Sequence, residues 1–121
     1  MANPFVHVEL QSNDLKKARE FYAKLFDWKL EDVPMPGMGT YTTITVGEGT
    51  GGGMMVNQAK GMPSHWLAYV GVADIVASTK RAKELGAHIA LDVTPVADIG
   101  TMSVIVDPSG AALGLWQPKK G

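Results

Sequence analysis

The stretch Phe5–Leu15 reads FVHVELQSNDL and contains the pattern from which the fold can be predicted. It opens with apolar and polar residues in strict alternation, which is the period-two pattern of a half-buried strand. Asn13 and Asp14 follow, and either residue type is suited to capping the N-terminus of a helix. The stretch therefore predicts a strand over residues 5–11 that leads directly into a helix over residues 15–26.

The same pattern returns in the second half of the chain, with a strand over residues 65–71, a cap at Asp74 and a helix over residues 75–85. A constant offset of sixty residues is typical of a tandem duplication in which each half is one supersecondary unit. We therefore predict one domain of two modules, over about residues 1–60 and 61–121. Identical residues at this offset are Asp14 and Asp74, Leu25 and Leu85, Asp32 and Asp92, Val33 and Val93, and Val46 and Val106.

Three shorter extended segments follow each predicted helix. They are residues 28–33, 41–46 and 53–58 in the first module, and residues 88–93, 101–106 and 111–117 in the second. Turn sequences stand at matching places before the last segment, GEGTGG at 47–52 and DPSG at 107–110. The first turn also fits G-x-G-x-x-G, but no helix follows it, so a dinucleotide site is not indicated. The sequence predicts an α+β fold of two tandem βαβββ modules.

The composition is that of an ordinary globular chain. Of the 121 residues 45% are apolar, and the formal net charge is -1. Basic residues are spread among acidic ones and apolar runs are short, so we expect no nucleic-acid or membrane partner. The chain lacks cysteine and starts without a signal-like segment, from which we expect a cytoplasmic protein. Edge strands in both modules lead us to expect a homodimer.

Two sequence runs carry a resemblance to a known family. The opening run HVELQSNDL at 7–15, with FY at 21–22 and LFDW at 25–28, resembles the vicinal oxygen chelate superfamily, and so does the closing run DPSGA at 107–111 with LGLW at 113–116. This superfamily includes glyoxalase I, extradiol dioxygenases and bleomycin-resistance proteins. The resemblance covers essentially the whole chain and implies the duplicated βαβββ fold, with a curved mixed sheet around a cavity. It does not fix an activity, because one fold hosts many chemistries.

For metal-using members, the resemblance implies four ligands from the first and last strands of the two modules. Carried over by the motifs and the offset of sixty, these positions hold His7, Met54, Leu67 and Gly114. Only His7 carries a donor that Zn, Ni, Fe(II) or Mn would bind. We therefore expect no metal or other cofactor. The alternative is a divalent metal held by His7, Glu9 and His65.

The sequence instead predicts an organic-ligand pocket on the concave face of the sheet. His7 and Glu9 are the candidate catalytic pair, since an imidazole and a carboxylate can transfer protons near neutral pH. Ligand binding without catalysis is the other interpretation of this pair. Trp66 alternates to the helix-facing side and is expected in the core. The candidate substrate-binding positions, which accompany Gln11 on the concave face, are Met54, Val56, Leu67, Tyr69, Gly114 and Trp116.

These residues favour a protein that binds a small, partly apolar organic molecule without the family's metal, with acid–base catalysis left open. One alternative is a metal-dependent, glyoxalase-like lyase or dioxygenase with an unusual ligand set. Another is a structural dimer with an occluded cavity. Because Met54 and Gly114 replace metal-binding side chains, we expect open space in the cavity beside His7, Tyr69 and Trp116.

Overall fold

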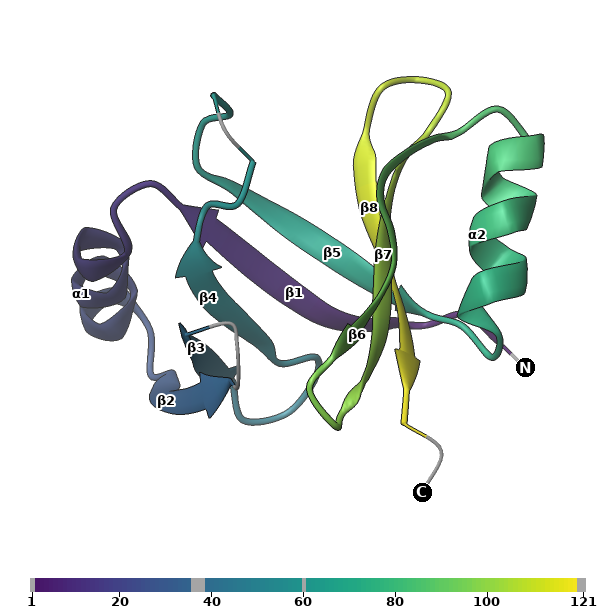
Figure 1. Ribbon diagram of the computed structural model, residues 1–121. Helices are drawn as coiled ribbons and strands as arrows, with labels where there is room; N and C mark the ends of the chain where they lie inside the picture. The colour runs from purple at the N-terminus through teal and green to yellow at the C-terminus, as the bar shows by residue number, and fades with distance from the viewer. Residues whose placement is uncertain (1, 36–38, 60, 120–121) are drawn as a thin grey trace. The chain divides into compact units, whose positions relative to one another are not determined.

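The computed structural model describes residues 2–35, 39–59 and 61–119. A strand, a helix and three strands follow one another twice along the chain (Figure 1). The predicted α+β fold of two βαβββ modules is therefore confirmed. The first module contains β1 (Phe5–Ser12), α1 (Leu15–Leu25), β2 (Lys29–Met35), β3 (Gly39–Thr45) and β4 (Gly52–Val56), and the second contains β5 (His65–Gly71), α2 (Ile75–Glu84), β6 (His88–Val96), β7 (Gly100–Val106) and β8 (Ala112–Pro118).

Each helix begins after an aspartate. The side chain of Asp14 accepts a 3.1 Å hydrogen bond from the backbone N–H of Lys17, and Asp74 accepts one of 3.1 Å from the N–H of Ala77. These bonds satisfy N–H groups for which the first helical turn provides no partner. Of the two cap residues that the sequence allows for α1, Asp14 is the one used.

Contacts divide the chain into two compact units. The N-terminal unit is His7–Leu67, and the C-terminal unit combines residues from Ala68 onward with the segment up to Val6. In the N-terminal unit the strands lie in the order β2-β3-β4-β1, with β1 parallel to β4 and the other pairs antiparallel. The C-terminal unit has the equivalent order β6-β7-β8-β5, with β5 parallel to β8.

The core of the N-terminal unit lies between α1 and its sheet. Leu10, Ile44 and Met54 are buried there, and Ala18 and Tyr22 of the helix pack against them. These helical residues are four apart, so they lie on the same face of α1. The apolar residues of three strands and one helix thus form a single cluster.

The apolar pattern of α1 overstates what the helix buries. The sequence predicts that Phe21, Leu25 and Phe26 belong to its buried face, but all three are exposed. The prediction is wrong for these residues, because α1 covers only part of a narrow four-stranded sheet and its apolar stripe is wider than the contact. The N-terminal unit therefore keeps an exposed apolar surface along α1.

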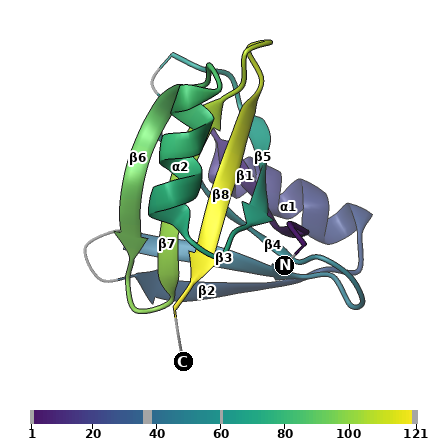
Figure 2. The same ribbon diagram turned by 90° about the vertical axis from the view of Figure 1, so that its right-hand side faces the viewer.

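In the C-terminal unit, α2 packs against β6, β7 and β8 (Figure 2). Val72, Ile75 and Leu115 are the buried residues of this core. A hydrogen bond of 2.9 Å joins the buried hydroxyls of Thr79 and Ser103, which ties the helix to β7. Among the residues that the structure describes, neither helix has the length and hydropathy that crossing a membrane requires.

Candidate functional site

Strand β1 presents His7, Glu9 and Gln11 on the face of the sheet opposite α1. Its register with β4 pairs Leu10 with Met54, and both residues belong to the core beneath the helix. Because side chains alternate along a strand, the odd-numbered residues of β1 point to the other face. The three polar side chains therefore share one face, as the alternation in the sequence predicts.

Tyr41 on β3 connects two of these side chains. Its hydroxyl oxygen lies 2.7 Å from His7 Nε2 and donates a 2.8 Å hydrogen bond to Glu9 Oε2. The imidazole and phenol rings are inclined by only 27°, with 6.2 Å between their centroids. The sequence does not indicate this role for Tyr41, because β3 reaches β1 only through β4 and periodicity carries no information about the register between strands.

Glu9 is buried, and both of its carboxylate oxygens accept hydrogen bonds. Gln11 Nε2 donates to Glu9 Oε1, and Gln11 Oε1 accepts a 3.0 Å bond from the backbone N–H of Gln58. A buried carboxylate is costly unless such bonds compensate for lost hydration. We call the continuous set of His7, Tyr41, Glu9 and Gln11 the polar row.

Burial lowers the pKa of His7 from its ordinary value of 6.5, and the nearby charge of Glu9 partly opposes this change. The charged imidazolium loses hydration when it is buried, whereas the neutral ring loses less. The net direction is downward, so His7 is neutral at neutral pH. A neutral imidazole has one N–H donor and one acceptor nitrogen, and can bind two different kinds of polar group.

The lowered pKa of His7 predicts how stability changes with pH. The unfolded imidazole binds a proton more tightly than the folded one, so protonation favours unfolding. This part of the free energy of unfolding is present above pH 6.5 and is lost as the pH falls through the folded pKa. Urea unfolding between about pH 8 and about pH 5 should show the loss. His7→Gln retains an amide donor for Tyr41 and should show a shallower pH dependence; identical slopes would contradict the prediction.

Two predicted binding positions do not belong to the polar row's face. Met54 has no exposed surface and lies in the core beneath α1, and Val56, two residues further along β4, is 58% exposed. The prediction that Met54 and Val56 line a pocket with His7 is wrong. The residues of β4 that share the face of His7 are Gly53 and Met55, which pair with Glu9 and Gln11.

The cause of this error is that the repeat offset is not constant. Glu9 pairs with Gly53, and Tyr69 pairs with Gly114, so the last strands are offset by 61 residues and the first strands by 60. The pairing of β2 with β3 is unbroken, whereas that of β6 with β7 shifts register twice between Ile89 and Thr94. Irregularities of this kind insert residues into one strand only. Because Glu9 and Tyr69 occupy equivalent places on the first strands, their partners Gly53 and Gly114 are structural counterparts.

Both counterpart glycines lie against a tyrosine. A Cβ atom at Gly53 would lie 2.0 Å from the Tyr41 hydroxyl oxygen, and one at Gly114 would lie 2.3 Å from the ring of Tyr69. Glycine is required there for the close approach of the two rings. The prediction of open space at Gly114 is wrong, because the Tyr69 ring occupies it.

The remaining predicted binding residues lie on β5 and β8, close to where the sequence predicts strands over residues 65–71 and 111–117. Leu67 and Tyr69 are buried on β5, and Trp116 on β8 is partly buried. Tyr69, Gly114 and Trp116 lie on the sheet face opposite α2, since the neighbouring Leu115 packs beneath that helix. Their role in binding a substrate stays a prediction.

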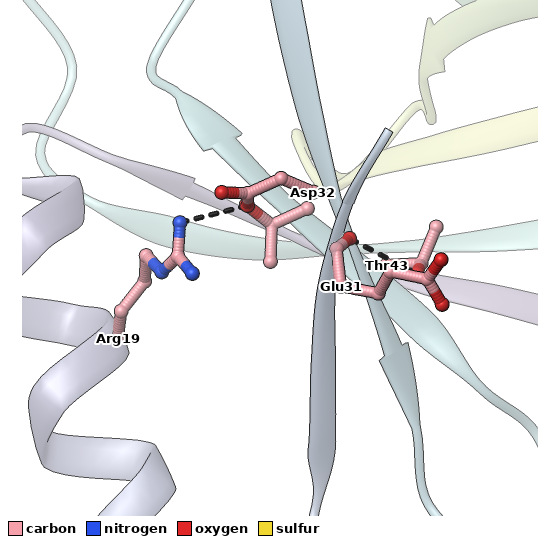
Figure 3. Close-up of polar contacts among 5 residues, drawn as sticks. Arg19, Glu31, Asp32 and Thr43 are labelled. Atoms are coloured by element: carbon pink, nitrogen blue, oxygen red, sulfur yellow. Dashed lines mark hydrogen bonds and ion pairs between the residues drawn. The ribbon is translucent and has the colours of Figure 1, made fainter. Parts of the chain in front are cut away.

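Contacts on both faces of the sheet hold β3, which carries Tyr41, in place. On the helix side, Arg19 of α1 forms a 2.8 Å ion pair with Asp32 of β2, as Figure 3 shows. The hydroxyl of Thr42, which is buried on β3, donates to the same carboxylate oxygen. The hydrogen bond from Thr42 is the largest cause of the lowered pKa of Asp32, and the hydrogen bond from Arg19 is the second. Thr43 donates to the carbonyl of Glu31 (Figure 3). The strand is thereby fixed in register with β2.

Comparison with known proteins gives the family. Residues 5–115 match the family model of the Glyoxalase/Bleomycin resistance protein/Dioxygenase superfamily. The chain belongs to this superfamily. It is 37% identical over 117 residues to "Putative glyoxylase CFP32" of Mycobacterium tuberculosis, a match that covers 93% of the chain and 45% of that protein. It is 30% identical over 128 residues to "Anthracycline biosynthesis protein DnrV" of Streptomyces peucetius, covering 90% of the chain and 45% of the relative. The chain thus spans less than half the length of these superfamily relatives.

Solved structures of the superfamily fold are similar to this chain. A hypothetical protein from Bacillus halodurans has a TM-score of 0.74 with 18% identity, over 100% of this chain and 98% of the other. Methylmalonyl-CoA epimerase from Mycobacterium tuberculosis has a TM-score of 0.71 with 17% identity, over 96% of this chain and 88% of the other. At these identities the likeness concerns the fold alone.

The residues at the superfamily's metal positions do not fit a divalent cation. The register of β4 places Gly53, and not Met54, at the metal position of that strand. Neither Gly53 nor Leu67 nor Gly114 has a side-chain atom that could bind a metal. Within the described ranges, no three His, Cys, Asp or Glu side chains lie together so as to hold a metal ion. The alternative set with His65 is not assembled, and His65 Nδ1 instead contacts the carbonyl oxygen of Pro63 at 2.9 Å.

A separate hollow of about 290 Å³ lies on the α1 side of the N-terminal unit's sheet. Trp66 lines it and is 40% exposed, so the prediction that Trp66 is a core residue is wrong. Trp66 packs edge-on against Trp28 and Tyr22, which leaves part of its ring at the surface. The residues that line this hollow, most of them apolar, are Val8, Trp28, Ile44, Val46, Thr50, Gly51, Gly52 and Trp66.

Proposed function

We propose that the chain binds a small, partly apolar organic molecule at the polar row, and that it does so without a metal. The observation that carries this proposal is the burial of Glu9 together with its hydrogen bond to Tyr41, which in turn contacts His7. A sheet face that needed only to pack would favour apolar residues at these positions, because buried polar groups contribute little net stability.

The chemistry of the polar row suits recognition of an oriented polar group. Glu9 supplies a carboxylate, Gln11 an amide and His7 an imidazole. Tyr41 adds aromatic surface beside them. Small-molecule sites combine apolar contact with a few fixed polar groups of this kind. Two relatives named for anthracycline biosynthesis support a fused-ring aromatic molecule as the ligand class.

The test is a titration of ¹⁵N-labelled protein with an anthracycline. We expect the largest amide shift changes at Glu9, Gln11 and Gly53, and smaller ones at Asp32 on the opposite face. His7→Ala should weaken binding about tenfold, which is the contribution of roughly one hydrogen bond. Val56→Ala is the control, because Val56 is 58% exposed and does not lie on the face of the polar row, and this variant should bind as the wild type does. EDTA should change nothing.

Two outcomes would count against the proposal. Shift changes confined to Trp66 and its neighbours would place the ligand in the separate hollow on the α1 side. Loss of binding in EDTA, restored by added zinc or manganese, would favour the metal-dependent alternative.

Acid–base catalysis by His7 and Glu9 is the second candidate function. The hydrogen-bond path from His7 through Tyr41 to Glu9 favours it, because a proton can move along such a path. Incorporation of solvent deuterium into a bound molecule would distinguish catalysis from binding alone.

We also propose that two copies of the chain associate. The exposed apolar side chains of Phe21, Leu25 and Phe26 on α1 are surface that an association would cover.

A further inference from the structure

We infer that Tyr41 sets the tautomer of His7, so that the neutral imidazole carries its proton on Nε2. Both nitrogens of an imidazole can hold the proton, and the partner of one nitrogen decides between them. At the far end of the polar row, the backbone N–H of Gln58 is a donor of known direction.

The direction of each bond follows from that donor. A backbone N–H can only donate, so the atom of Gln11 that faces Gln58 is the acceptor oxygen Oε1. The amide nitrogen of Gln11 then faces Glu9, and Glu9 Oε1 accepts from it. The other carboxylate oxygen, Oε2, accepts from the Tyr41 hydroxyl. This pattern is the one that an ionised carboxylate makes with two donors.

Tyr41 transmits this direction to His7. A phenol has a single proton, and Tyr41 donates it to Glu9, so its oxygen can only accept from His7. The 2.7 Å contact therefore requires a proton on Nε2 of His7. Because His7 is neutral at neutral pH, its Nδ1 then carries no proton. Gly53 allows this geometry, since a side chain there would displace the phenol ring.

His65 provides an internal reference with the opposite tautomer. Its Nδ1 lies 2.9 Å from the carbonyl oxygen of Pro63, which can only accept, so the proton of a neutral His65 is on Nδ1. The structure thus assigns different tautomers to two histidines of the same unit.

The tautomer decides which ring nitrogen of His7 donates and which accepts, and hence which polar group of a small molecule it recognises. This consequence rests on the proposed function. The tautomer itself does not, since it follows from contacts within the ligand-free protein.

The experiment is two-bond ¹H–¹⁵N correlation spectroscopy of the histidine rings at about pH 8, where an ordinary imidazole is neutral. In the wild type we expect His7 mainly as the Nε2–H form and His65 mainly as the Nδ1–H form. Tyr41→Phe removes the acceptor, so the Nε2–H preference of His7 should fall about tenfold, the equivalent of one hydrogen bond. The His65 signals should not change.

Glu9→Gln gives a sharper result because it nearly preserves shape. Gln11 still donates to the one remaining side-chain oxygen at position 9, so the new amide nitrogen faces Tyr41 and donates to it. Tyr41 then donates to His7 Nε2, and His7 should switch to the Nδ1–H form. The Nε2–H form loses one hydrogen bond and the Nδ1–H form gains one. The ratio of the two tautomers should therefore reverse by tenfold or more.

An Nδ1–H tautomer of His7 in the wild type would overturn the inference, as would a tautomer that neither substitution changes. Unchanged His65 signals show that a variant is folded, and if Tyr41→Phe fails to fold, Glu9→Gln decides alone. No ligand is present in these measurements. Their failure therefore leaves the proposed function standing, and failure of the anthracycline titration leaves the tautomer standing.

Discussion

Met54→Ala should lower the free energy of unfolding by about 2–5 kcal/mol, the usual cost of truncating a large side chain in a core. Met54 has no exposed surface and contacts the cluster that contains Leu10 and Ile44. Truncation removes those contacts and leaves a cavity that the two parallel strands and α1 can only partly close. Urea unfolding monitored by tryptophan fluorescence measures the loss.

Val56→Ala is the matched control on the same strand. Val56 is 58% exposed, so its truncation should cost less than about 1 kcal/mol. A Met54 variant as stable as the wild type but with weakened ligand binding would show instead that Met54 belongs to the pocket, as the sequence alone predicts.

Gly52→Ala should destabilise the protein by about 3 kcal/mol or more, at the upper end of the usual cost of overpacking. A Cβ atom at Gly52 would lie 2.0 Å from the carbonyl oxygen of Val8, which belongs to the backbone of the paired strand β1. Relief requires β1 and β4 to separate, and that would break ladder hydrogen bonds between them. Thermal and urea unfolding give the value.

Gly53→Ala is the informative comparison, because its clash is also at 2.0 Å but involves the side chain of Tyr41. A side chain can rotate away, so in a Tyr41→Ala background the cost of Gly53→Ala should fall by at least about 1 kcal/mol. The cost of Gly52→Ala should not change in that background by more than about 0.5 kcal/mol. Equal rescue of both variants would mean that the close approach of Val8 is not what requires Gly52.

Features that depend on local chain geometry could be predicted from the residues alone. Alternation in β1 placed His7, Glu9 and Gln11 on one face, because successive side chains of any strand point to opposite sides. Asp14 and Asp74 marked the helix starts, because a carboxylate just before a first turn satisfies N–H groups nearby in the chain. Repetition of these local signals was enough to predict two βαβββ modules.

The contacts between residues of different strands became known only from the folded protein. The pairing of β1 with β4 places Gly53, and not Met54, beside Glu9, although neither strand's own pattern reveals this register. The extent to which α1 covers the sheet decided that Trp66 reaches the surface. Strand pairing likewise brings Tyr41 into the polar row, because only β4 separates β3 from β1. Such contacts depend on strand pairing and packing between segments far apart in the chain, whereas periodicity reports only the neighbours of each residue along it.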